Sequence, residues 1–256
     1  MLNFSANLSL LFTEHALIDR FKAAKHAGFS AVEIQFPYEL TAVAIKNQLD
    51  EYDLKLVLFN VDALDLLAGG EGLACVSERR EQFNLAIDQA IEYADLLKPV
   101  AINILPGRCL DPKRLEHCLE TFKENLNAAV EAFAPLAVKT VFEAINTHDM
   151  PGFIIHNHLQ MLNVINQLNR PGLFMQYDIY HMQMMDENPE AFISDYADKI
   201  GHIQFADSPG RGQPGTGRID FDRVFAAIDE SNYSGWVGAE YKPVGTTQES
   251  LGWLTP

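Results

Sequence analysis

The sequence predicts an α/β fold in which eight parallel strands alternate with eight helices, and three observations support this prediction. Short apolar runs alternate with helical stretches along all 256 residues, at a mean spacing of roughly 33 residues. Each return from one strand to the next passes through a helix, which makes neighbouring strands parallel. No composition shift or low-complexity tract divides the chain. Eight such units close into a (β/α)8 barrel, the TIM barrel, so we expect a single domain over residues 1–256.

The strands are expected where apolar runs stop at Pro, Gly or a polar residue. The first alternates polar and apolar residues, and the second stops at Pro37. The sixth is the run from Gly172 that ends abruptly in Asp-x-x-His, at Asp178 and His181. The expected strands cover residues 3–8, 31–36, 55–60, 100–105, 139–145, the run around Asp178, 200–205 and 235–241.

The helices are expected between these runs, where apolar residues recur at helical spacing. Gly28 ends the first helix, and Asp111 followed by Pro112 begins the fourth as an N-cap and first-turn proline. An open doubly wound sheet is disfavoured, because no G-x-G-x-x-G turn follows the first strand. The helices are expected at about 13–27, 41–52, from 77, from 111, 156–168, 189–197, 220–229 and 246–253, the last being short.

Composition limits the partners that the protein is expected to bind. The formal net charge of −16 disfavours binding to nucleic acid or to an anionic membrane surface, since both need a basic face. The three cysteines form no C-x-x-C pair, so neither a disulfide framework nor a zinc ribbon is indicated and a cytoplasmic location is expected. We expect no signal peptide and no membrane span.

Acidic and amide side chains stand at the carboxyl ends of the last four strands, the end at which barrel enzymes carry their active sites. These residues are Glu143, Asp178, Gln204 and Glu240. A single acid in a strand usually contacts water, but four such residues at one end of four consecutive strands favour a shared site. Carboxylates that converge repel one another, and a divalent cation removes that conflict. The oxygen donors favour one Mg²⁺ or Mn²⁺ over zinc.

Two histidines and two basic residues are weaker candidates for contacts to substrate or for support of the site. His181 could be a metal ligand, a support for a ligand, or a core residue. His202 lies two residues before Gln204 and so points inward but deeper in the barrel. Arg211, in the turn-rich loop 207–217, and Lys242 could each hold a substrate carboxylate, and each could equally be a surface charge.

Two further segments have alternative interpretations. The pair His156 and His158 has metal-ligand spacing, but Asn157 between them is a good helix N-cap, so a structural role is favoured. The Gly-rich segment 68–72 lies in a long insertion after the third strand, and it could be a lid over the site or a surface excursion.

At these residues the sequence resembles the hydroxypyruvate isomerase family of the xylose isomerase-like TIM barrels, over essentially the whole chain. The resemblance lies in Phe36-Pro37-Tyr38, Glu143-Ala144-Ile145-Asn146 with Pro151-Gly152-Phe153, Gln176-Tyr177-Asp178-Ile179-Tyr180-His181, Pro214-Gly215-Thr216-Gly217, and Gly235-Trp236-Val237-Gly238 continuing into Glu240-Tyr241-Lys242-Pro243. It implies metal ligation by the residues matching Glu143, Asp178, Gln204 and Glu240, and proton transfer by the two glutamates. The segment 64–71 departs from the family pattern, which bears on the substrate more than on the reaction.

The expected function is a metal-dependent, aldose–ketose type isomerisation of a small hydroxy-keto acid, in carbohydrate acid metabolism. Hydroxypyruvate to 2-hydroxy-3-oxopropanoate (tartronate semialdehyde) is the first candidate. Alternatives are a 2-oxo-tetronate isomerase or another sugar or sugar-acid isomerase or epimerase of the superfamily, and a non-catalytic sugar-acid binding barrel. An apurinic endonuclease-like nuclease is a distant alternative, since strands two to four end in Phe36, Asn60 and Leu105 rather than His. A homo-oligomer is compatible with such a barrel.

Overall fold

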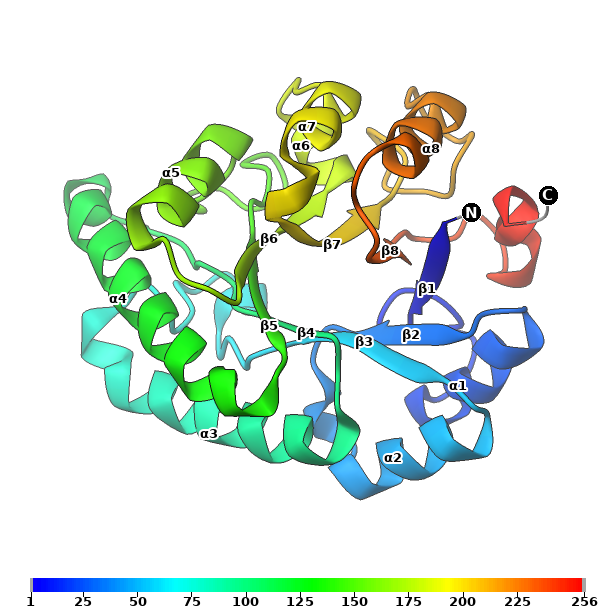
Figure 1. Cartoon of the computed structure of the whole chain (residues 1–256), viewed down its shortest axis with the longest axis horizontal. Coiled ribbons are helices and arrows are strands. Elements are labelled where there is room, and N and C mark those ends of the chain that lie inside the picture. Colours follow the sequence, from blue (N-terminus) through cyan, green and yellow to red (C-terminus); the bar gives the residue numbers. More distant parts are fainter. Residues whose placement is uncertain (1, 255–256) are drawn as a thin grey trace.

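The computed structural model describes residues 2–254 as a closed barrel of eight parallel strands surrounded by helices (Figure 1), which confirms the predicted fold. Strand order around the barrel follows the sequence, and β1 closes the ring by pairing with β8. The strands are β1 Asn3–Asn7, β2 Ala31–Ile34, β3 Lys55–Asn60, β4 Ala101–Asn103, β5 Lys139–Glu143, β6 Leu173–Asp178, β7 Ile200–Phe205 and β8 Trp236–Ala239.

The outer layer consists of α-helices, and short 3-10 turns lie in the connections between the strands and these helices and after β8. The α-helices are α1 Leu17–His26, α2 Ala42–Glu51, α3 Arg80–Leu97, α4 Leu115–Phe133, α5 His158–Leu168, α6 Ile179–Met184, α7 Pro189–Tyr196 and α8 Phe221–Glu230. The 3-10 turns are η1 Pro37–Glu39, η2 Leu66–Ala68, η3 Ser77–Arg79, η4 Pro112–Arg114, η5 Ala134–Leu136, η6 Ala197–Lys199 and η7 Gln248–Trp253. Within residues 2–254, no helix is both long and apolar enough to cross a bilayer.

Two helix predictions need correction, and one helix was missed. The first helix begins at Leu17 rather than near residue 13, because residues 8–15 form turns before it. The segment expected as a short last helix is the 3-10 turn η7. The short helix α6 was not predicted. It begins directly after β6, where the Asp178 side chain caps it by accepting a hydrogen bond from the His181 N–H.

Strand register determines which side chains share a level inside the barrel. Glu143 pairs with Gln176 across β5 and β6, and Asp178 pairs with Gln204 across β6 and β7. Gln204 in turn pairs with Gly238 of β8. In parallel strands the side chains alternate between the interior and the helical layer. The register therefore brings polar side chains of β5 to β8 to one end of the interior.

Candidate functional site

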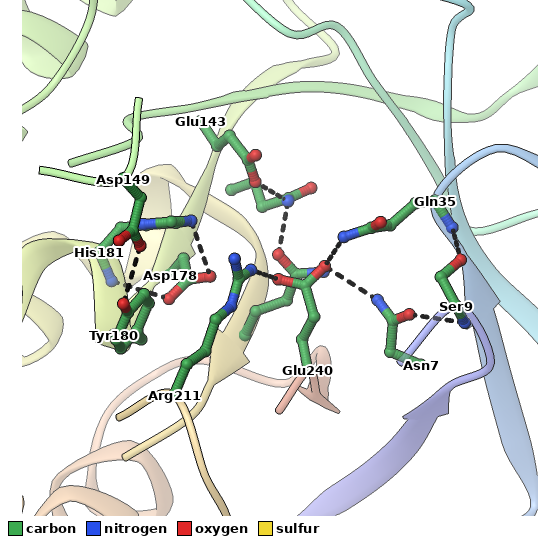
Figure 2. A network of polar contacts seen from close by, with 12 residues as sticks. Asn7, Ser9, Gln35, Glu143, Asp149, Asp178, Tyr180, His181, Arg211 and Glu240 are labelled. Atoms are coloured by element: carbon green, nitrogen blue, oxygen red, sulfur yellow. Dashed lines mark hydrogen bonds and ion pairs between the residues drawn. The ribbon is translucent and has the colours of Figure 1, made fainter. Parts of the chain in front are cut away.

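The four residues expected at the strand ends converge at the carboxyl end of the barrel. Glu143 ends β5, Asp178 ends β6, Gln204 is the penultimate residue of β7, and Glu240 directly follows β8. All four side chains are buried. Figure 2 shows Glu143, Asp178 and Glu240 facing a common space that the guanidinium of Arg211 enters.

The three carboxylates influence one another electrostatically. Burial is the largest cause that raises the pKa of Glu143 well above its usual range, and the charges of Glu240 and Asp178 raise it further. Burial likewise raises the pKa values of Asp178 and Glu240, and in both cases the nearby Arg211 opposes the effect. Removal from water and mutual repulsion disfavour the charged forms together. The cluster therefore favours the approach of positive charge.

Among the described residues that line the cavity, Arg211 carries the positive charge that faces these carboxylates. Its Nη2 donates a hydrogen bond to Glu240 Oε2 at 2.8 Å, and its guanidinium carbon lies 5.2 Å from the centre of the Tyr180 ring. Burial opposes the arginine charge, but Glu240, Asp178 and Glu143 outweigh burial and raise the pKa of Arg211. Its Nε is buried and has no hydrogen-bond partner among the described residues. Arg211 therefore stays charged and retains a donor for a further acceptor.

The position of Arg211 depends on the loop between β7 and α8, which closes around the buried side chain of Asp207. Its two carboxylate oxygens accept hydrogen bonds from four backbone N–H groups, those of Ser208, Gly215, Gly217 and Ile219, at 2.7–3.1 Å. Gly217 has no room for a side chain, because a Cβ there would lie 2.2 Å from the Ser208 carbonyl oxygen.

His181 lies beside Asp178 in a neutral form. Its Nε2 is 3.8 Å from Asp178 Oδ2, and its Nδ1 lies 2.7 Å from Asn146 Nδ2. Burial and the charge of Arg211 lower the pKa of His181 to about 3. The Tyr180 hydroxyl donates to Asp149 (Figure 2). The Asn146 amide also donates to Asp149, so this side of the site forms one hydrogen-bonded group.

A second polar layer lies below the first, and its centre, Glu33 of β2, was missed in the sequence. His202 lies there, with its Nε2 2.8 Å from Glu33 Oε2. Gln204 donates from Nε2 to Glu33 Oε1 at 2.7 Å. Burial raises the pKa of Glu33, but the charge and hydrogen bond of His202 and the donors from Gln204 and Asn7 outweigh it and lower the pKa.

Three further polar residues contact the site and were also missed. Gln176 Nε2 donates to Glu143 Oε2 and to Gln204 Oε1. Asn7 and Gln35 both donate to Glu240 Oε1, at 3.0 and 2.7 Å. Gln176 lies two residues before Asp178, so strand periodicity could have identified it as an inward residue.

The cavity at this end is lined by both polar and apolar side chains. Its volume is about 80 Å³, within a larger opening of about 490 Å³. Its lining residues are Gln35, Phe36, Asn60, Leu67, Leu105, Glu143, Ile145, Asp149, Met150, Gln176, His181, Arg211 and Glu240. Lys242 is not among them: its side chain is exposed, and its backbone N–H donates to the Arg211 carbonyl oxygen.

The insertion after β3 contributes Leu67 to this cavity. Two ion pairs fix the segment, since Asp65 contacts Arg79 at 2.8 Å and Glu71 contacts Arg114 at 3.1 Å. In the His156–His158 segment, the Asn157 side chain accepts a hydrogen bond from the Gln160 N–H at the start of α5, which agrees with a capping role.

The donor chemistry fits a hard divalent cation. Within residues 2–254, no three His, Cys, Asp or Glu side chains are already arranged to enclose a metal ion, and the carboxylates are disposed around Arg211. The groups present are nevertheless oxygen donors of the kind that Mg²⁺ and Mn²⁺ prefer. Gln204 adds Oε1, because its Nε2 is used by Glu33.

Comparison with known proteins identifies the family to which the chain is similar. Residues 21–256 match the family described as xylose isomerase-like TIM barrel. The chain is 41% identical to the hydroxypyruvate isomerase of Escherichia coli K12 and 39% identical to the 2-oxo-tetronate isomerase of Pectobacterium atrosepticum, in each case over all of this chain and at least 98% of the relative. A crystal structure titled AP endonuclease, family 2, from Brucella melitensis superposes with a TM-score of 0.94 at 36% identity, covering 99% of this chain and 98% of that one.

Proposed function

Since the chain belongs to the xylose isomerase-like TIM barrel family and is an isomerase of that family, we propose that it isomerises a small 2-keto-3-hydroxy acid through an enediolate. The first candidate reaction converts hydroxypyruvate to 2-hydroxy-3-oxopropanoate. The observation that carries the proposal is that Glu143, at the end of β5, and Glu240, directly after β8, line the same small cavity. Two carboxyl groups at one cavity can remove a proton and return it to a neighbouring carbon.

The two glutamates have different environments, which suits different roles. Glu240 accepts hydrogen bonds from Asn7, Gln35 and Arg211, all of which favour its carboxylate form. Glu143 accepts from Gln176, and burial raises its pKa well above the usual range. In the ligand-free site Glu240 is therefore the more readily ionised group, and Glu143 is the one that more readily holds a proton.

In the proposed reaction one glutamate removes a proton from C3 of hydroxypyruvate, and the other delivers a proton to C2. A proton also passes from the C3 oxygen to the C2 oxygen, so that the product has the same atoms as the substrate. A divalent cation held by Glu143, Asp178, Gln204 and Glu240 would supply Lewis-acid stabilisation of the negative charge that develops on these oxygens.

Arg211 is the group proposed to hold the substrate carboxylate. It is the cationic side chain that lines the described cavity, and its Nε donor is unused. A guanidinium can bind a carboxylate through two parallel hydrogen bonds. The lining also contains the apolar side chains of Phe36, Leu105 and Met150, which would pack against carbon. A short acid with one charged end fits a cavity that offers one cation and several apolar side chains.

The test measures solvent deuterium incorporation at C3 of hydroxypyruvate by NMR, together with turnover, in the presence of Mn²⁺. E143Q and E240Q are each expected to lose about 10²–10⁴-fold in turnover, the usual contribution of acid–base catalysis. E187Q makes the same chemical change at a glutamate that contacts His158 outside the cavity, and it is expected to retain turnover. Near-normal turnover in either E143Q or E240Q would refute the two-glutamate mechanism. No exchange in wild type would indicate a binding protein.

A 2-oxo-tetronate is the second candidate substrate. The Pectobacterium atrosepticum relative with that name is nearly as similar to this chain as the Escherichia coli relative. The two acids differ in chain length, so the cavity must discriminate at the end that lies away from Arg211. The ratio of kcat/KM for the two acids under the same conditions identifies the preferred substrate.

Nuclease activity is not favoured, although the Brucella melitensis structure is titled an AP endonuclease. The apurinic endonuclease branch that this barrel resembles needs a trinuclear zinc cluster with several histidine ligands. Here β3 ends in Asn60, and His181 is the one histidine that lines the described cavity. The formal charge of −16 also opposes binding to a phosphate backbone. Absence of cleavage of an abasic-site duplex, with zinc supplied, is the expected result.

A further inference from the structure

The buried carboxylate of Glu33 is the centre of a hydrogen-bond network beneath the site. Its Oε1 accepts from Asn7 Nδ2 at 3.0 Å and from Gln204 Nε2 at 2.7 Å. Its Oε2 accepts from Ser5 Oγ at 3.0 Å, and His202 Nε2 lies 2.8 Å away. The side chain is fully buried, so these four contacts replace water. The two oxygens thus have four close polar neighbours, which come from β1 and β7.

The barrel wall leaves space for this carboxylate at Gly238 of β8. A Cβ at Gly238 would lie 2.3 Å from Glu33 Oε2 and 2.6 Å from Glu33 Oε1. Any larger residue would therefore displace the carboxylate. Because Gly238 pairs with Gln204 in the sheet, the space lies at the level of the residue that Glu33 contacts.

The contact with Glu33 determines which end of the Gln204 amide faces the site. An amide has one donor end and one acceptor end. The donor end is bound by Glu33, so Oε1 lies on the other side, where it accepts from Gln176 Nε2 at 2.6 Å. Rotating the amide by half a turn would place an oxygen against the Glu33 carboxylate, which is repulsive.

A second contact of Glu33, with Asn7, helps to orient the Asn7 amide toward Glu240. Asn7 Oδ1 accepts from the Ser9 N–H at 3.0 Å, which fixes the amide, and Asn7 Nδ2 donates to both Glu33 Oε1 and Glu240 Oε1. Glu33 is therefore connected to two of the four residues at the strand ends, Gln204 directly and Glu240 through Asn7.

We propose that Glu33 is a positioning residue, which holds Gln204 with its oxygen toward the site and Asn7 with its amide toward Glu240. The inference rests on the proposed function in that Gln204 and Glu240 belong to that site. Its role depends on the reach of two acceptor oxygens. A residue that served only to balance the charge of His202 would depend on the negative charge instead.

Two conservative substitutions separate these roles. E33D keeps the charge but withdraws the carboxylate by about 1.5 Å, one carbon–carbon bond, which places Gln204 beyond hydrogen-bond distance. E33Q removes the charge but keeps the length, and its oxygen can still accept from Gln204 and Asn7. Its amide nitrogen can then donate to the Ser5 hydroxyl.

The experiment measures Mn²⁺ affinity by electron paramagnetic resonance of the free ion, in wild type, E33D and E33Q. E33D is expected to bind Mn²⁺ about 10–100-fold more weakly, as for other residues that orient metal ligands. E33Q is expected to stay within about fivefold of wild type on the same grounds. E187D and E187Q control for shortening or neutralising a glutamate elsewhere, and both are expected to bind Mn²⁺ as wild type does.

A second measurement follows the Gln204 side chain directly in metal-free protein labelled with ¹⁵N-glutamine. Its amide signal, identified by its loss in Q204E, is expected to shift and to exchange faster with water in E33D and to change less in E33Q. Equal affinities, or a greater loss in E33Q than in E33D, would overturn the inference. If wild type binds no Mn²⁺, the proposed function fails, and the amide signal alone then decides the role of Glu33.

Discussion

The D207N substitution is expected to disrupt the loop between β7 and α8 that positions Arg211 in the cavity. The carboxylate of Asp207 is fully buried and accepts four backbone N–H groups. Asparagine keeps one acceptor oxygen and replaces the other by a donor, so two N–H groups lose their partner. A hydrogen bond to a charged group contributes about 1.5–3 kcal/mol, which sets an upper limit of about 6 kcal/mol for the two. The loop can relax into solvent, so we expect a loss of about 3 kcal/mol.

The free energy of unfolding is measured by urea denaturation, and loop exposure by limited proteolysis between residues 206 and 220. Because Arg211 is held by this loop, kcat/KM is expected to fall at least about tenfold. D220N is the matched control: Asp220 caps α8 by accepting from the Arg223 N–H at 3.2 Å, and asparagine caps a helix equally well. A change below about 0.5 kcal/mol in D207N, no larger than an ordinary surface substitution, with unchanged kcat/KM, would refute the reasoning.

Three further results are expected. In metal-free protein, E143Q should have a higher free energy of unfolding than wild type at pH 8 and the same free energy of unfolding at pH 4. The pKa of Glu143 is raised in the folded state, so wild type loses stability as the pH rises from the pKa of the unfolded state through that of the folded state. Urea denaturation from pH 4 to 8 measures this, and a gain at low pH would contradict it. Y180F removes the 2.7 Å hydrogen bond to Asp149 and should lower the free energy of unfolding by about 1–2 kcal/mol. K242A should keep kcat/KM within about twofold of the wild-type value, since the exposed side chain does not line the cavity. A tenfold fall would show that Lys242 contributes to the site.

The strand ends were predictable because their signal is local. Val141 to Ala144 and the run ending at Asp178 each place one acid at the end of buried sequence, and strand order in a barrel of this kind brings such ends together. Val32-Glu33-Ile34 also embeds an acid in buried sequence, but Glu33 lies inside the strand rather than at its end, so the strand-end pattern does not identify it. A buried acid in any barrel strand therefore needs a partner, whether or not it lies at the mouth.

The position of Arg211 could not be predicted, because it depends on contacts between residues separated in sequence. Asp207 reaches N–H groups as far away as Ile219, and no periodicity indicates which acid in a turn-rich loop will bind the backbone. The 3-10 form of η7 was also unpredictable, since a six-residue segment with helical composition can adopt either helix type.

The charge balance of the site explains why the proposal requires a divalent rather than a monovalent cation. Three carboxylates, Glu143, Asp178 and Glu240, surround one guanidinium, that of Arg211. When all are ionised, two negative charges remain uncompensated, and this excess is consistent with the raised pKa values of the carboxyl groups. A divalent cation would neutralise the remainder, and Arg211 would then be free to bind the carboxylate of an anionic substrate.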